Sequence, residues 1–149
     1  MQVKDYLEQI RWLNGNIRSK LEQREQLCAM IYSMPIHDIK EDYIQQSAEK
    51  DHIGSAMAKL VDMEQELSRE IELLCDLREQ VNRQIDAMKS ERYKLLLRLR
   101  YLNGYTFEEV ADEMSYTYRW TIKMHKEALR QFDEMIRKED AAVHCNASD

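Results

Sequence analysis

The stretch YTFEEVADEMSYTYRWTIKMHKEAL, residues 105–129, contains the boundaries of two consecutive helices. Thr106 is followed three residues later by Glu109, which is the spacing of a capping box: each side chain accepts a hydrogen bond from the other residue's backbone N–H. This predicts a short helix over Phe107–Met114. Residues 115–117 then interrupt the apolar pattern, and the last of them is a threonine suited to the N-cap of a second helix over residues 118–138.

A short helix, a turn of about three residues and a longer helix are the parts of a helix-turn-helix motif. Inward positions on the two helices are Val110, Ala111 and Met114, then Thr121, Met124 and Leu129. The small side chain of Ala111 lets the helices cross closely. The outward face of the second helix has aromatic, apolar and basic side chains that could contact the major groove of DNA. Thr117 is the N-cap of this helix and can also contact a phosphate. The candidate DNA-binding residues are therefore Thr117, Tyr118, Arg119, Ile122, Lys123, Lys126 and Arg130.

Each of these residues could also have a purely structural role. The basic side chains can form a solvated helix face paired with Glu127 and Asp133. Tyr118 and Trp120 can pack into the core instead of meeting bases, and for Trp120 the pattern favours neither outcome. We expect DNA contact for the basic set because of the motif around it.

The segment LLLRLRYLNGYTFEEVADEMSYTYRWTIKMHKEAL, residues 95–129, resembles region 4 of bacterial sigma factors and the related ArpU-like phage regulators of late transcription. The resemblance covers about residues 92–132; the cap, turn glycine, inward alanine and closing Ala-Leu fall in register. DYLEQIRWLNGNI, IQQS and AKLVDMEQEL, earlier in the chain, are similar to an uncharacterised family from prophages of Gram-positive bacteria. The resemblance implies a three-helix module over residues 90–138, recognition of double-stranded promoter DNA, and contact with RNA polymerase.

Two positions depart from the sigma pattern. Ser115 stands where that turn usually has glycine, and Thr121 stands where the core usually has valine. No segment resembles the parts of a sigma factor that melt promoter DNA. The resemblance therefore implies an activator or a partial sigma-like adaptor rather than a complete sigma factor.

The first half of the chain predicts a long antiparallel helical hairpin, or coiled coil, over residues 1–89. Apolar residues at helical spacing indicate a helix from Val3 that ends at Met34, because Pro35 disfavours helical geometry in the residue before it. Residues 34–52 are polar without sustained periodicity and are expected to be a connecting loop. A second long helix should follow, with this heptad seam: Ile53, Met57, Leu60, Leu67, Ile71, Leu74, Val81, Ile85 and Met88. Glu64 and Arg78 interrupt the seam; they either set the register of pairing or face solvent.

Composition supports an all-α chain, since 149 residues include 3 Gly and 1 Pro. Three cysteines without paired spacing and the lack of a long apolar run indicate a cytoplasmic protein with no membrane segment. The four histidines are scattered, and we expect no metal, no cofactor and no enzymatic activity. Residues 139–149 are expected to form a disordered tail.

Charge is consistent with a DNA-binding C-terminal segment in an acidic chain. The net charge is −6, but residues 91–138 hold ten Lys and Arg against eight Asp and Glu. An excess this small predicts weak binding by one copy, so we expect a homodimer through the hairpin to place two copies on adjacent half-sites. The alternative function is an adaptor that binds a protein partner through the hairpin or the last helix. A basic stripe on the last helix would favour DNA, and an apolar patch containing Trp120 and Ile122 would favour a protein.

Overall fold

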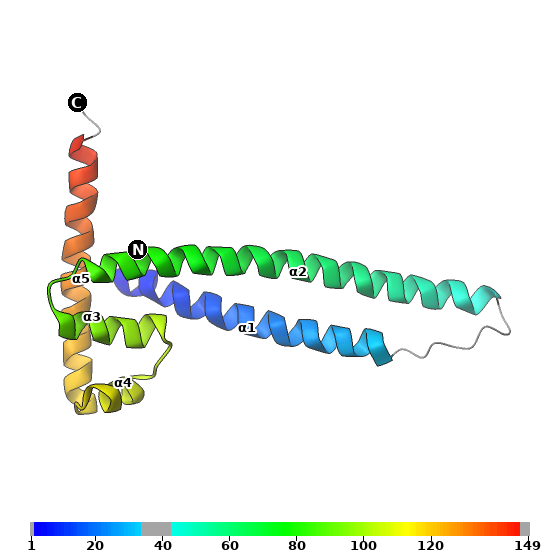
Figure 1. Cartoon of the computed structure of the whole chain (residues 1–149), viewed down its shortest axis with the longest axis horizontal. Helices are drawn as coiled ribbons and strands as arrows, with labels where there is room; N and C mark the ends of the chain where they lie inside the picture. Colours follow the sequence, from blue (N-terminus) through cyan, green and yellow to red (C-terminus); the bar gives the residue numbers. More distant parts are fainter. Residues whose placement is uncertain (1, 34–42, 147–149) are drawn as a thin grey trace. The chain divides into compact units, whose positions relative to one another are not determined.

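Helices account for all the regular structure in the part of the chain that is described (Figure 1). A computed structural model describes residues 2–33 and 43–146, and of residues 43–51 and 146 it describes the backbone alone. The elements are α1 Val3–Ser33, α2 Tyr43–Asp86, α3 Glu91–Leu97 with a π turn at Arg98–Leu102, α4 Phe107–Met114 and α5 Tyr118–Asn146. The predicted all-α class is confirmed. In the described residues no helix is long and apolar enough to cross a membrane.

Two predicted boundaries are wrong. Helix α2 begins at Tyr43, so residues 43–52 are helical and not part of a loop, while residues 34–42 lie outside the described part. Helix α5 continues to Asn146, so residues 139–146 are not a disordered tail, and residues 147–149 again lie outside. Both segments contain the good helix formers Ala and Glu and lack Gly and Pro, which sustains a helix that already has a packed portion.

Contacts divide the chain into two compact units at places other than the expected boundary at residues 89 and 90. One unit contains Met1–Leu13 and Leu74–Asp149, and the other contains Asn14–Leu73. The first turns of α1 and the end of α2 therefore belong with the C-terminal helices.

In the unit Asn14–Leu73, α1 and α2 run antiparallel. The Lys20 ammonium forms ion pairs with Glu70 and Glu66, and the hydrogen bond to Glu70 raises the pKa of Lys20. Ile17 and Leu67 are buried between the helices.

The seam on α2 agrees with the prediction at Leu60, Leu67, Leu74, Val81, Ile85 and Met88 and departs from it at the remaining positions. Within this unit the covered positions of α2 are Ala56, Leu60, Met63, Leu67 and Glu70, which alternate steps of four and three. Ile53, Met57 and Ile71 of the predicted seam are exposed instead, and so is Glu64, which the prediction treated as an interruption. Glu64 thus does not interrupt the packed stripe, because Met63 occupies that place in it.

The other unit has the larger core. Side chains that are fully buried include Leu7, Ile10, Val81, Ile85, Leu96, Leu97, Tyr101, Val110, Ala128 and Phe132. They come from the first turns of α1, the end of α2 and the C-terminal helices, and they hold α3 and α4 against α5.

Polar contacts connect the end of α2 to α3 and the π turn. Arg78, which the sequence left undecided, donates from Nη1 to the Leu102 carbonyl oxygen at 2.7 Å, at the end of the π turn. Arg98 pairs with Asp86. The π turn itself is closed by the Asn103 N–H, which donates to the Arg98 carbonyl at 2.9 Å, and Gly104 follows with φ +77°. Glycine suits this left-handed conformation because it has no Cβ.

Candidate nucleic-acid interface

The start of α4 has the capping box that the sequence predicts. The Glu109 N–H donates to Thr106 Oγ1 at 3.2 Å, and the Thr106 N–H donates to Glu109 Oε2 at 2.8 Å. Both hydrogen bonds satisfy backbone groups that the first turn of a helix leaves unpaired. The prediction of a helix over Phe107–Met114 is confirmed in type and in bounds.

The turn between α4 and α5 depends on a left-handed serine. Ser115 has φ +58° and ψ +41°, which is the conformation that glycine adopts most easily. The N–H groups of Ser115 and Tyr116 donate to the carbonyls of Asp112 and Ala111, closing the helix with a Schellman motif. Ser115 adopts this conformation at the cost of backbone strain.

Thr117 caps the next helix. Its Oγ1 accepts a hydrogen bond from the Trp120 N–H at 3.2 Å, and its carbonyl accepts one from the Thr121 hydroxyl at 2.9 Å. Thr121 is fully buried, so this second bond satisfies the hydroxyl that replaces the valine of the sigma pattern. Both departures from that pattern are thus accommodated locally.

The inward face of α5 consists of buried Thr121, Met124, His125, Ala128 and Phe132. Leu129, which was predicted to point inward, is only half-buried. His125 was not identified from the sequence. Its position one residue after Met124 in a helix whose inward residues are spaced by three and four is the signal that could have found it.

His125 is a neutral core residue. Its Nε2 lies 2.7 Å from the Tyr101 hydroxyl oxygen, and its ring meets the Phe107 ring edge-on at a centroid distance of 4.8 Å. Burial, followed by the positive charges of Arg100 and Lys4, lowers the pKa of His125 from 6.5 to about 4. Burial also raises the pKa of the Tyr101 hydroxyl. Arg100 stacks over Phe107, with its guanidinium carbon 4.1 Å from the ring centroid, and donates to the Tyr105 carbonyl at 2.9 Å.

The opposite face of α5 is basic. Arg119, Lys123 and Lys126 are exposed and repeat at intervals of four and three, so they form one stripe, which we call the basic stripe. At 3.6 residues per turn it lies opposite the fully buried Ala128. Among the residues that the structure describes, none forms an ion pair or hydrogen bond with these three side chains. Their charges are available to an external anion.

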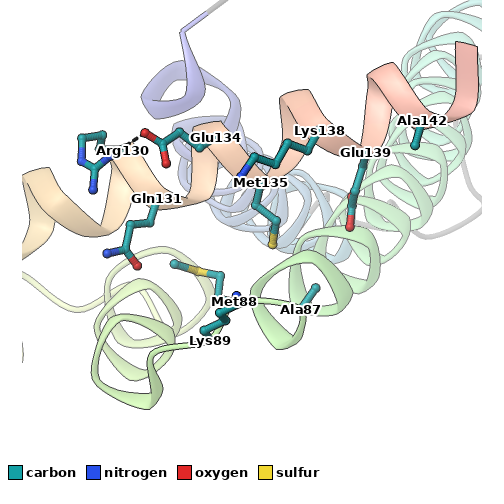
Figure 2. A pocket seen from close by; sticks show the side chains of 10 residues that line it. All are labelled: Ala87, Met88, Lys89, Arg130, Gln131, Glu134, Met135, Lys138, Glu139 and Ala142. Atoms are coloured by element: carbon teal, nitrogen blue, oxygen red, sulfur yellow. Dashed lines mark hydrogen bonds and ion pairs between the residues drawn. The ribbon is translucent and has the colours of Figure 1, made fainter. Parts of the chain in front are cut away.

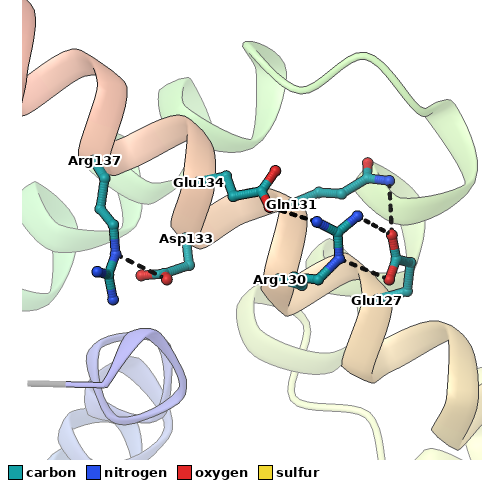
Figure 3. Close-up of polar contacts among 6 residues, drawn as sticks. All are labelled: Glu127, Arg130, Gln131, Asp133, Glu134 and Arg137. Carbon is teal, nitrogen blue, oxygen red and sulfur yellow. Dashed lines mark hydrogen bonds and ion pairs between the residues drawn. The ribbon is translucent and has the colours of Figure 1, made fainter.

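Arg130 falls on the same face but differs in its environment (Figure 3). Its guanidinium pairs with Glu127 on one side and Glu134 on the other. The hydrogen bond from Arg130 lowers the pKa of the Glu127 carboxyl to about 2. Arg130 also lies about 16 Å along the helix from Arg119, at 1.5 Å per residue. Local carboxylates compensate its charge, and we separate it from the basic stripe.

Aromatic and apolar side chains flank the basic stripe. Tyr118 and Trp120 are 49% and 47% exposed, and Ile122 is half-buried. Successive helical residues differ by about 100°, so Tyr118 and Ile122 lie on one side of the stripe and Trp120 on the other. Trp120 and Ile122 therefore do not form one continuous apolar patch.

Helix α4 presents the opposite charge. Glu108, Glu109, Asp112 and Glu113 are all exposed on a helix of eight residues. A polyanion that approached α4 directly would be repelled. Helix α4 and the basic stripe on α5 thus carry charges of opposite sign.

Two of the hollows that border α5 differ in charge. One, of about 640 Å³, lies between the end of α2 and the later turns of α5, where Met88 and Met135 are accompanied by charges of both signs (Figure 2). The other, of about 490 Å³, lies between the first turn of α1 and α5 and is lined by Lys4, Lys126, Arg130 and Arg137 with a single carboxylate, Asp133. The described residues contain no group of three or more His, Cys, Asp or Glu able to hold a metal ion.

Comparisons of the chain with protein-family models, with curated proteins and with solved structures find no match.

Proposed function

We propose that this chain is a sequence-specific DNA-binding transcription regulator without enzymatic activity, whose residues 90–138 act as a sigma-region-4-like helix-turn-helix module. The basic stripe is the observation that carries the proposal. It follows a three-residue turn, lies opposite the buried face of α5, and consists of three cations that have no ion-pair or hydrogen-bond partner in the described part of the chain. Recognition helices read bases with residues of their first turns, and this is where Arg119 and Lys123 lie.

Roles can be assigned to the individual side chains. Arg119 has the planar donor geometry that binds the O6 and N7 acceptors of guanine, and Ile122 and Tyr118 beside it offer apolar contact to a thymine methyl group. Lys123 and Lys126 neutralise phosphates. Thr117, as the N-cap, sits where backbone N–H groups of a helix start can approach a phosphate. Arg130 contributes least, because Glu127 and Glu134 already neutralise it.

The biological setting comes from the resemblance noted in the sequence. Phage or prophage late-gene control in the cytoplasm, with contact to RNA polymerase, fits a region-4-like module that lacks promoter-melting parts. A homodimer is supported by the exposed apolar side chains Ile53, Met57, Val61 and Ile71 on α2. Two modules on adjacent half-sites would offset the weak binding of each.

The alternative is an adaptor that binds a protein partner. The apolar residues on α2 favour it for the helical hairpin, because a two-helix unit leaves one face of each helix uncovered. The last helix does not favour it, because Trp120 and Ile122 lie on different sides of the basic stripe. DNA binding by α5 and protein binding by the hairpin are compatible in one regulator.

The double substitution Arg119→Ala, Lys123→Ala tests the proposal. We expect it to abolish sequence-specific binding to DNA from upstream of the chain's own gene and from the late operon, measured by gel shift, with helicity unchanged. The matched control is Lys89→Ala, Lys138→Ala, which removes two exposed positive charges from the same unit away from the stripe. Equal loss in both variants, or full binding by the first, would refute the assignment.

A further inference from the structure

The first turn of α1 contributes to the same basic surface as the start of α5. The hollow of about 490 Å³ described above, which we call the Lys4 hollow, is lined by Lys4 from α1 and by Lys126, Arg130, Asp133 and Arg137 from α5. Both elements belong to the compact unit that contains Met1–Leu13 and Leu74–Asp149. Residues more than a hundred positions apart in sequence therefore share one surface.

The cations of the Lys4 hollow are not equivalent. Arg137 pairs with Asp133 at 3.0 Å, and Arg130 pairs with Glu127 and Glu134. Lys4 and Lys126 are exposed and have no ion-pair partner among the described residues. The hollow thus holds two unpaired ammonium groups from different elements, and its single carboxylate is already paired. This arrangement favours an anion between the two ammonium groups.

Lys126 connects this hollow to the basic stripe. Arg119 and Lys126 are seven residues apart, which is about 10 Å along the axis of α5. The major groove is about 12 Å wide, so a helix whose first turn meets base edges brings residues two turns later to the phosphates that border the groove. Lys4 lines the same hollow as Lys126 and therefore lies on the side of α5 that would approach these phosphates.

We propose that the Lys4 hollow binds a backbone phosphate of the same DNA whose bases meet the start of α5, with Lys4 and Lys126 as the neutralising groups. The proposal rests on the proposed DNA-binding function and extends it to α1. The N-terminal helix then serves both the hairpin and the DNA-binding surface. One backbone contact from α1 also fixes the orientation of α5 on the duplex, since phosphate contacts position a protein without reading sequence.

Salt dependence measures such a contact directly, because log K falls with log[salt] by about 0.9 for each phosphate neutralised. The test uses the full chain and a fluorescent duplex from its own upstream DNA, with affinity measured by anisotropy over a series of KCl concentrations. Lys4→Ala should lower the magnitude of the slope by about 0.9, so that a fourfold rise in salt weakens wild-type binding roughly three- to fourfold more than variant binding. Lys4→Arg should restore the wild-type slope.

Lys89→Ala is the matched control, because Lys89 is an exposed lysine of the same unit that lines the other hollow. Its slope should equal that of the wild type. Suppose that the wild type binds the duplex and that Arg119→Ala, Lys123→Ala abolishes this binding. A wild-type slope for Lys4→Ala would then overturn the role of the Lys4 hollow alone. Failure of the wild type to bind any duplex would overturn the proposed function and this inference together.

Discussion

Acidification should destabilise the C-terminal helices through one residue, His125. The folded unit holds its imidazole neutral, since burial and the nearby charges of Arg100 and Lys4 lower its pKa from 6.5 to about 4. The Tyr101 hydroxyl and the Phe107 ring, which also contact it, supply no negative charge at neutral pH that would stabilise an imidazolium. An unfolded chain takes up the proton near pH 6.5, and the folded chain resists it until about pH 4.

The sign and the size follow from this difference. Stability due to neutral His125 is complete above about pH 6.5, and it is lost as the pH falls toward 4, because the unfolded state then binds more protons. At about 1.4 kcal/mol per pKa unit, the free energy of unfolding should decrease by about 3 kcal/mol across this window.

Urea denaturation at several pH values provides the assay. Both tryptophans, Trp12 and Trp120, lie in the unit that contains His125, so tryptophan fluorescence reports the unfolding of that unit. His125→Gln serves as the reference, because an amide can still hydrogen-bond the Tyr101 hydroxyl but does not titrate. The difference in unfolding free energy between wild type and variant cancels the common carboxylate titrations. Parallel loss of stability in the two proteins between pH 6.5 and 4 would show that protonation of His125 does not destabilise this unit.

Two further substitutions test local features of the fold. Ser115→Gly should raise the free energy of unfolding by up to about 1 kcal/mol, measured by urea denaturation, because glycine adopts the left-handed conformation without strain; a decrease would show that the serine side chain has a role that its backbone does not explain. In the hairpin, Leu67→Asp should cost several kcal/mol and reduce helicity, because it buries a carboxylate that has no partner. Ile71 is 41% exposed, so Ile71→Asp should instead retain helicity and convert a dimer to a monomer in sedimentation equilibrium. Equal effects of Leu67→Asp and Ile71→Asp on helicity would contradict the observed seam. An unchanged mass for Ile71→Asp would contradict the dimer.

Local chemistry made the C-terminal elements predictable. The Thr106 and Glu109 pair defines the start of α4 because both partners of the capping box lie within four residues of each other. Thr117 defines the start of α5 for a similarly local reason, because its hydroxyl accepts a hydrogen bond from the N–H of Trp120, three residues later. Each of these features can be read from the sequence because no distant residue is needed to make it.

Features that depend on neighbours in space were not predictable. Six of the nine predicted seam positions on α2 are covered, but Ile53, Met57 and Ile71 are exposed, because the partner of a helix decides which of its apolar positions are packed. The polar segment that begins α2 and the end of α5 lack apolar periodicity. Their helical structure was therefore not predicted, although their residues have good helix propensity. The π turn at Arg98–Leu102 and the burial of His125 against Tyr101 depend on the packing of α3 against α5.

The candidate site was predicted as a set of residues but not as a surface. Arg119, Lys123 and Lys126 have the exposure that DNA contact requires, while Arg130 is engaged by two glutamates on its own helix. Lys4 was not considered, because nothing in a linear sequence relates the first turn of the chain to residue 126.

The central claim is that the beginning of α5 meets DNA. Nuclear magnetic resonance of isotope-labelled protein, titrated with a duplex from its own upstream region, tests this claim residue by residue. We expect the amide shifts to concentrate at residues 117–126, with Lys4 as the outlying member. Shifts confined to the exposed face of α2, or none at all at concentrations where the duplex binds, would contradict it.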